Sequence, residues 1–254
     1  LLLRTPVEPK REASLPAPPL RAAGAGPAAG ATKNADGSEA VEAATPLVAD
    51  FTCAAPQSQF SYPEGRSACT TIAVEACLAL LTDSGAAVDA ATFEEPSKIL
   101  GVLTRGVEEY KRINAGNPVE HMACAEVLLM SEKYGGVLEH VLMVQGVTEG
   151  GDAFVTELTE TLRGALADSA PVCAVVTKPP ETVVCFVHPN GSVALFDSHP
   201  RPTLGVEGAY VSGFSSVKAA AAFLRTIFPA VGGLGDSYMA QMYNSFDLTV
   251  LRRK

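Results

Sequence analysis

The sequence predicts an α+β fold in which helices come first and an antiparallel sheet follows. Residues 70–113 carry apolar residues at helical spacing, whereas the β-rich runs VCAVVT, TVVCFVH and SVALFDSH come later. Asn190-Gly191 lies between the last two runs, and Asn-Gly between β-rich runs is a strong hairpin signal. Strands joined by a hairpin are antiparallel, which disfavours a parallel βαβ arrangement.

Residues 1–46 differ in composition from the rest of the 254-residue chain. They are rich in Ala, Pro and Gly, and the first aromatic residue is Phe51. Such a segment cannot bury enough apolar surface to offset the entropy of ordering it, so we expect a disordered leader. Residues 47–254 are predicted to form one folded domain.

Two helices are expected in the first half of this domain, over residues 70–81 and 97–113. In each, apolar residues recur every three or four positions and form one stripe. The stripe of the first helix comprises Cys69, Ile72, Ala73, Ala76, Cys77 and Leu80. The charged residues of the second helix, expected to be solvated, are Arg105, Glu108, Glu109, Lys111 and Arg112.

The second half contains further segments of both kinds. VLEHVLMVQG at residues 137–146 is predicted to be a strand, and FDLTVL at residues 246–251 a final strand. Residues 154–167 and 216–228 are predicted to be helices. The sequence of residues 123–133 does not distinguish between a helix and a strand.

Composition narrows the partners and the compartment. The formal net charge of −9 disfavours nucleic acid and anionic membranes and leaves a basic protein or peptide as the natural ligand. No window approaches the roughly 18–20 apolar residues of a membrane span. The six cysteines contain no CxxC pair and lie mostly in apolar runs, as free thiols do in a reducing compartment, so we expect an intracellular protein, cytoplasmic or nuclear. We also expect a monomer. His121 and Cys124 have HxxC spacing without a second pair nearby, so no metal or cofactor is expected.

Cys69 stands where a loop containing Pro, Gly and Arg opens into the first predicted helix. A cysteine at a helix N-terminus has a lowered pKa because the unpaired N–H groups and the dipole stabilise the thiolate, which is the nucleophile. A small core residue that begins the helix fits the same position. The distinction therefore depends on residues elsewhere in the sequence.

A thiol nucleophile needs a base, and the chain has four histidines. His199 lies in LFDSH with Asp197 two residues earlier, and residues i and i+2 of a strand point to the same side. The carboxylate can then fix the imidazole tautomer and stabilise the imidazolium. The alternative is a strand end whose Asp and His make only turn contacts before Pro200.

A third requirement is a donor to the oxyanion, which is often an amide side chain near the helix start. Gln57 and Gln59 both lie in a segment that must approach the N-terminal end of the helix begun by Cys69. A nucleophilic cysteine early on a helix, with a histidine base late on a sheet, is the papain-like arrangement.

The other histidines are weaker candidates for the base. His188 is the rival to His199, but it directly precedes the hairpin turn and is expected far from the end of the next strand. His121 and His140 have no partner pattern and are expected at the surface or in satisfied core positions.

The stretch QSQFSYPEGRSACT, followed by VLTRGVEEY and VALFDSHPR, resembles the deubiquitinase domain of herpesvirus large tegument proteins and its cellular and bacterial relatives. That family pairs an early Gln, a Gly-x-x-x-Cys helix start, a helix reading L-x-x-G-x-x-x-Y and a strand ending F-D-x-H. All four occur here in that order, and the resemblance spans roughly residues 50–251.

The resemblance implies a papain-like cysteine protease that hydrolyses (iso)peptide bonds at the C-terminal glycine of ubiquitin or a ubiquitin-like modifier. Cys69 would be the nucleophile, His199 the general base and then acid, and Asp197 the orienting carboxylate. Gln57 would be the oxyanion donor, with Gln59 as the alternative. Two other functions remain open: a papain-like peptidase, amidase or transglutaminase acting on another substrate, and an inactive module that binds ubiquitin.

Overall fold

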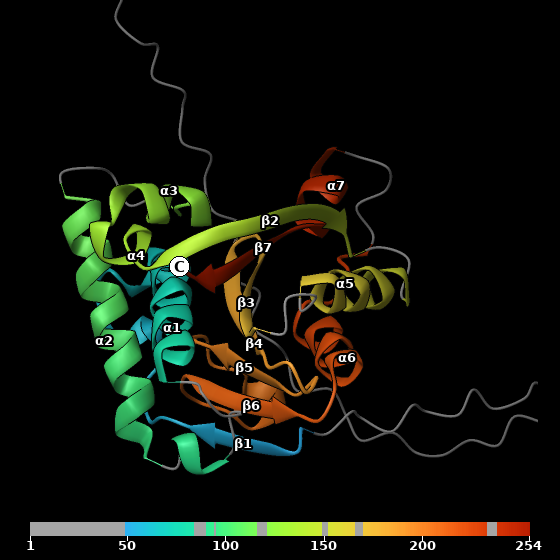
Figure 1. Cartoon of the computed structure of the whole chain (residues 1–254), viewed down its shortest axis with the longest axis horizontal. Helices are drawn as coiled ribbons and strands as arrows, with labels where there is room; N and C mark the ends of the chain where they lie inside the picture. The colour runs from blue at the N-terminus through green and yellow to red at the C-terminus, as the bar shows by residue number, and fades with distance from the viewer. Residues whose placement is uncertain are drawn as a thin grey trace, which may run out of the picture. The chain divides into compact units, whose positions relative to one another are not determined.

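The computed structural model describes residues 49–83, 90–93, 95–115, 121–148, 152–165, 170–232 and 238–254, all within one compact unit. Its centre is a seven-stranded sheet with strand order β1-β6-β5-β4-β3-β7-β2, in which every pairing is antiparallel (Figure 1). The strands are β1 (Phe51–Ala54), β2 (Leu138–Val147), β3 (Val172–Lys178), β4 (Glu181–Val187), β5 (Val193–Asp197), β6 (Tyr210–Phe214) and β7 (Ser245–Arg253).

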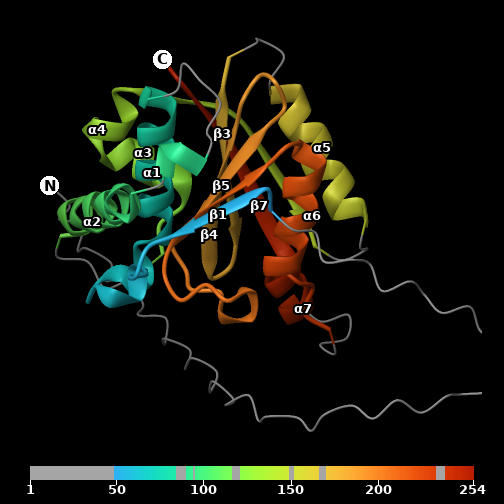
Figure 2. The same ribbon diagram turned by 90° about the horizontal axis from the view of Figure 1, so that it is seen from below.

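Helices cover both faces of the sheet (Figure 2). One face is covered by α1 (Cys69–Asp83), α2 (Pro96–Ile113), α3 (Cys124–Met130) and α4 (Glu132–Gly135). The other face is covered by α5 (Asp152–Ala165) and α6 (Val217–Ile227), and α7 (Tyr238–Asn244) leads into β7. Four short 3₁₀ helices complete the described elements: η1 (Gln59–Ser61), η2 (Gly65–Ser67), η3 (Ala90–Phe93) and η4 (Pro202–Leu204).

The middle strands are buried on both faces, which explains why their sequences show no polar alternation. Val184 and Phe186 of β4 pack against the α1–α4 side, whereas Val183 and Cys185 pack against the α5–α6 side. Neighbouring residues of a strand point to opposite faces, so each core receives every second residue. The predicted α+β class is confirmed, although β1 precedes the helices and α5 and α6 follow β2.

Helix α1 is buried on nearly all sides, which differs from the single apolar stripe that its sequence predicts. The sheet packs on one side of it and the other helices on the other, so even Glu75 is buried. Its two carboxylate oxygens pair with Arg105 of α2 and Lys133 of α4, each at 2.5 Å. A buried charge is tolerated there because both of its oxygens have cationic partners.

Helix α2 packs closely on α1 through a glycine. A Cβ at Gly106 would lie 2.6 Å from the Cα of Ile72, so only glycine allows this approach. Helix α2 is one residue longer than predicted. Glu109, which was expected on the solvated face, is buried. Its carboxylate accepts hydrogen bonds from Arg112 and from Ser131, which lies between α3 and α4.

The other predicted elements are present with shifted ends, and the open segment 123–133 forms α3 and α4. The Asn190-Gly191 turn joins β4 and β5, with Gly191 at φ +88°. The short strands β1 and β6 were not predicted. The predicted leader, residues 1–46, lies outside the described residues. None of the helices described is both long and apolar enough to cross a membrane.

The Gly106→Ala substitution is expected to lower the free energy of unfolding by about 1–3 kcal/mol, because the added methyl group meets the α1 backbone. Gly164→Ala on α5 is the matched control: a Cβ there meets nothing within 4 Å, and alanine favours helix by up to about 1 kcal/mol. Urea unfolding followed by circular dichroism measures both. Equal stabilities would contradict the close packing of α1 on α2.

Candidate active site

Cys69 is the first residue of α1, and only 1% of it is exposed. The chain enters the helix from η2, and the Ile72 N–H donates to the Ala68 carbonyl at 2.9 Å. The sulfur therefore lies in the first helical turn, where the helix dipole favours a thiolate.

Close packing fixes the segment that precedes Cys69. A Cβ at Gly65 would lie 1.7 Å from the carbonyl oxygen of Gln59, so glycine is required there. The Gln59 N–H donates to the Ser198 carbonyl at 3.0 Å, and the Ser198 hydroxyl donates to Gln59 Oε1 at 2.6 Å. These contacts bind the loop before the cysteine to the segment that follows β5.

Strand β5 ends at Asp197, and its carboxylate contacts His199. Asp197 Oδ1 accepts from His199 Nδ1 at 2.7 Å and from the His199 backbone N–H at 2.8 Å. Both residues are buried. The side-by-side placement predicted from the sequence is present, but the turn after the strand, and not a continuing strand, brings the ring back to the carboxylate.

Two further donors reach the same carboxylate. Asp197 Oδ2 accepts from Arg201 Nε at 2.7 Å and from the Tyr210 hydroxyl at 3.3 Å. Burial alone would raise the pKa of Asp197, but the hydrogen bond from His199 and the charges of His199 and Arg201 lower it. The carboxylate stays ionised, so it holds the His199 ring with Nδ1–H toward it and Nε2 available for chemistry.

Arg201 also joins this carboxylate to the neighbouring strand. Its Nη2 pairs with Glu181 of β4 at 2.8 Å, and its guanidinium lies 5.8 Å from the centre of the Phe228 ring. Glu181 directly follows Pro180, whose carbonyl oxygen lies 3.8 Å from Cys69 Sγ. Arg201 therefore pairs with both Asp197 and Glu181. Through Glu181 it fixes the start of β4, next to the Pro180 carbonyl that contacts the Cys69 sulfur.

Two imidazoles act on the sulfur of Cys69. His121 Nδ1 lies 3.7 Å from Sγ, and His199 lies near enough to affect the pKa of the same thiol. Burial alone would raise the pKa of the Cys69 thiol, but the hydrogen bonds from His121 and His199, together with their charges, lower it to about 6. Burial alone would lower the pKa of His199, but Asp197 and Cys69 raise it to about 10. Between these values the pair is a thiolate and an imidazolium.

His121 is the site residue that the sequence did not reveal. It was expected at the surface or in a satisfied core position, but it precedes α3 and contacts Cys69. Its side chain is exposed whereas His199 is buried, so His121 lies on the solvent side of the sulfur. No local pattern could show this contact, since the two residues lie 52 positions apart. The rival base, His188, lies at the hairpin, where its Nδ1 accepts from the Asn190 N–H.

Of the two glutamines, the structure brings Gln59 to the site. The side chain of Gln57, expected as the oxyanion donor, is exposed, and its Oε1 accepts from the Tyr62 hydroxyl at 3.4 Å. Gln59 is buried and contacts Ser198, the neighbour of His199. Gln59, the alternative to Gln57, is thus the glutamine held beside the His199 segment, because the tight turn η1 begins at Gln59 and its side chain is buried.

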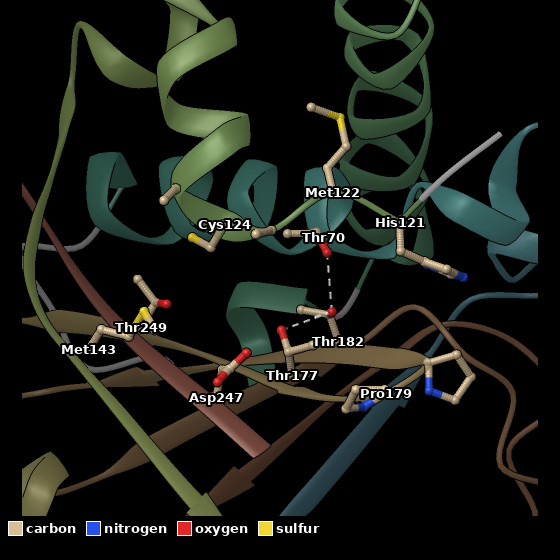
Figure 3. A pocket seen from close by; sticks show the side chains of 13 residues that line it. Thr70, His121, Met122, Cys124, Met143, Thr177, Pro179, Thr182, Asp247 and Thr249 are labelled. Carbon is tan, nitrogen blue, oxygen red and sulfur yellow. Dashed lines mark hydrogen bonds between the residues drawn. The ribbon is translucent and has the colours of Figure 1, made fainter. Parts of the chain in front are cut away.

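A cavity of about 350 Å³ adjoins the site (Figure 3). His121 and Pro180, which contact the sulfur, also form part of its wall, together with Thr70, the residue after the cysteine. The other lining residues are Met122, Ala123, Cys124, Ala125, Met143, Thr177, Pro179, Thr182, Asp247 and Thr249. Among the described residues, no group of three or more His, Cys, Asp or Glu could hold a metal ion.

Comparison with known proteins gives similarity to solved structures and no match at the level of sequence families. No protein-family model matches the sequence, and a search of curated proteins found no match. Among six matching chains of solved structures is PatoxP, a cysteine protease-like domain of the Photorhabdus asymbiotica toxin PaTox. The match has 12% identity and a TM-score of 0.41, and covers 71% of this chain but 48%, about half, of that chain. These values are too low to carry a role or a substrate, and the resemblance to herpesvirus tegument-type deubiquitinases stays a prediction.

The contact between His121 and Cys69 predicts a specific pH dependence. The rate of Cys69 alkylation by iodoacetamide is expected to rise with a midpoint near pH 6, the pKa of the thiol. In His121→Gln the thiol loses one hydrogen bond and one positive charge, so the midpoint should move up to about pH 7. Mass spectrometry of the Cys69 peptide between pH 4 and 9 measures this shift.

His188→Gln is the matched control for this measurement, since it removes an imidazole at the hairpin and should leave the midpoint unchanged. Cys77, Cys124 and Cys185 do not compete in this pH range, because burial raises the pKa of each thiol. A midpoint that is the same in wild type and His121→Gln would show that His121 does not act on the thiolate.

Proposed function

We propose that this protein is a thiol-dependent hydrolase that cleaves peptide or isopeptide bonds at the C-terminal glycine of ubiquitin or a ubiquitin-like modifier. One observation supports the hydrolase most directly: the pKa of a thiol at a helix N-terminus is lowered by an imidazole, His199, whose Nδ1 donates to the ionised Asp197. This is the arrangement of a thiol nucleophile, Cys69, with a base, His199, and a carboxylate that orients the base, Asp197.

In the first half of the proposed reaction, the Cys69 thiolate attacks the scissile carbonyl carbon, and negative charge moves to the carbonyl oxygen. The Gln59 amide, held beside the His199 segment, is the candidate donor to that oxygen. As the carbon–nitrogen bond breaks, the His199 imidazolium gives its Nε2 proton to the leaving amine. The products of this step are the free amine, a thioester on Cys69 and a neutral His199.

In the second half, water replaces the amine. Neutral His199 takes a proton from the water as its oxygen attacks the thioester carbonyl. The carbon–sulfur bond then breaks, Cys69 leaves as a thiolate, and His199 is again an imidazolium. The ion pair of the resting enzyme is restored without any cofactor.

The choice of a ubiquitin-like modifier is supported by the sequence motifs and by small residues before the nucleophile. Gly65 and Ala68 are both buried in the approach to Cys69, which suits a narrow cleft for a glycine tail. The net charge of −9 suits a basic tail and disfavours nucleic acid or an anionic membrane. We propose that the partner is the modifier with its conjugates, bound by a monomer inside the cell.

A second candidate is a papain-like peptidase or amidase acting on a substrate with a large side chain near the scissile bond. The observation that favours it is the cavity of about 350 Å³ beside Cys69, which a Gly-Gly tail would not fill. The chemistry at Cys69, His199 and Asp197 is the same in both candidates, since the triad sets the reaction and not the substrate.

The substitution Cys69→Ala is expected to lower kcat/KM at least about 10³-fold, because it removes the nucleophile. Fluorogenic substrates carrying ubiquitin or ubiquitin-like C-termini, run beside short amides, measure the effect. Cys53→Ala, which removes a thiol from β1, is the matched control and should keep activity. Cleavage of short amides alone would favour the second candidate, and activity that persists in Cys69→Ala would reject both.

Gln59→Ala is expected to lower kcat about 10²–10³-fold with little change in KM, as for the loss of one oxyanion donor. Gln57→Ala, two residues away and exposed, should change kcat less than about twofold. Steady-state kinetics of the two variants on one substrate make the comparison. A larger loss for Gln57→Ala than for Gln59→Ala would restore the assignment made from the sequence.

A further inference from the structure

The cavity beside Cys69 has an imidazole on one side and a carboxylate on the other. Among its described lining residues, only His121 and Asp247 have side chains that carry charge, because burial raises the pKa of the Cys124 thiol. They lie on opposite sides of the cavity in Figure 3. Since His121 contacts the Cys69 sulfur, Asp247 marks the end away from the reacting atom.

Three threonine hydroxyls connect the two ends. Thr70, next to Cys69, lies 3.2 Å from the Thr182 hydroxyl, which lies 3.1 Å from that of Thr177. Thr177 is the partner of Asp247 in the register of β3 and β7. The hydroxyls of Thr70, Thr182 and Thr177 are therefore linked in a row along one side of the cavity, from the residue after the nucleophile to the strand partner of Asp247 (Figure 3).

The carboxylate of Asp247 can accept a cation. It is half-buried, and its Oδ1 accepts from the neutral amide of Gln145 at 2.8 Å. Desolvation at such a position strengthens the attraction of a cationic ligand relative to that at an exposed carboxylate. Because this donor is neutral, the hydrogen bond itself does not compensate the negative charge of Asp247.

The rest of the wall is apolar. Met122, Met143 and Pro179 present side chains that suit an aliphatic stem, and methionine adapts to stems of different shape. The volume of about 350 Å³ is near the lower end for small-ligand sites, which suits one long side chain. An apolar wall with a carboxylate at its far end fits an aliphatic stem that carries a cation.

We propose that this cavity is a specificity pocket that binds a lysine or arginine side chain of the substrate near the scissile bond, with the cationic end at Asp247. The proposal rests on the proposed function in one respect, that Cys69 is the reacting atom. A positive charge on His121 would repel the cation from the near end, so the side chain enters with its charge directed away from the sulfur.

Two thiol-reactive probes test the pocket without requiring hydrolysis. Chloroacetyl-lysine amide and chloroacetyl-norleucine amide share a four-carbon stem, and only the first carries an ammonium group. In wild type the lysine probe is expected to modify Cys69 about tenfold faster, measured by mass spectrometry. In Asp247→Asn the ratio of the two rates should fall to about one.

Asp50→Asn is the matched control, because it removes the same charge beside β1, at the opposite edge of the sheet from β2 and β7. It should keep the tenfold ratio. A wild-type ratio near one, or a ratio that survives in Asp247→Asn, would overturn the proposal while leaving Cys69 as the nucleophile.

A second measurement covers the case in which Cys69 reacts with neither probe, which would count against the proposed function. The NMR signals of the Met122 and Met143 methyl groups are followed while N-acetyl-lysine methylamide or its norleucine analogue is added. Saturable shifts with the lysine compound, absent in Asp247→Asn, would support the pocket on its own. Equal shifts with both compounds, or none, would reject it.

Discussion

The buried carboxylate of Asp197 is the constraint on which the rest of the site depends. None of it is exposed, so its charge is tolerated only while its four hydrogen-bond donors keep their positions. Those donors come from His199 and Arg201 in the turn after β5, and from Tyr210 of β6. The register of two neighbouring strands and the orientation of one imidazole are therefore fixed together.

Charges of alternating sign extend outward from this carboxylate. Each charged group contacts one or two of opposite sign, so each is stabilised by its neighbours in a region with little water. The alternation explains how a thiolate can persist where burial alone would raise the pKa of the thiol. The series, in order of contact, is Glu181, Arg201, Asp197, His199, Cys69 and His121.

Sequence patterns located the parts of the site whose geometry is local. Cys69 at a helix start and the Asp197–His199 pair depend on neighbouring residues, and both were predicted. Sequence spacing did not separate Gln59 from Gln57, because η1 turns a short loop inward. It did not predict the contact of His121 with Cys69, because His121 reaches Cys69 only through the packing of distant segments. The same limit applies to the fold: β1 and β6 have only four and five residues and are ordered by pairing, so neither shows a strong periodic signal.

The two histidines around the sulfur have different surroundings and therefore different roles. Cys69 contacts His121 and Pro180, and of the two imidazoles only His121 is exposed, whereas His199 is buried. His121 is one of the two imidazoles that lower the pKa of the thiol, so it helps to keep the sulfur ionised where burial alone would favour the neutral thiol. His199 acts on the same sulfur from the buried side, where its Nδ1 is bound to Asp197. The two imidazoles therefore divide the work: His199 is oriented by a fixed carboxylate, and His121 stabilises the thiolate from the exposed side.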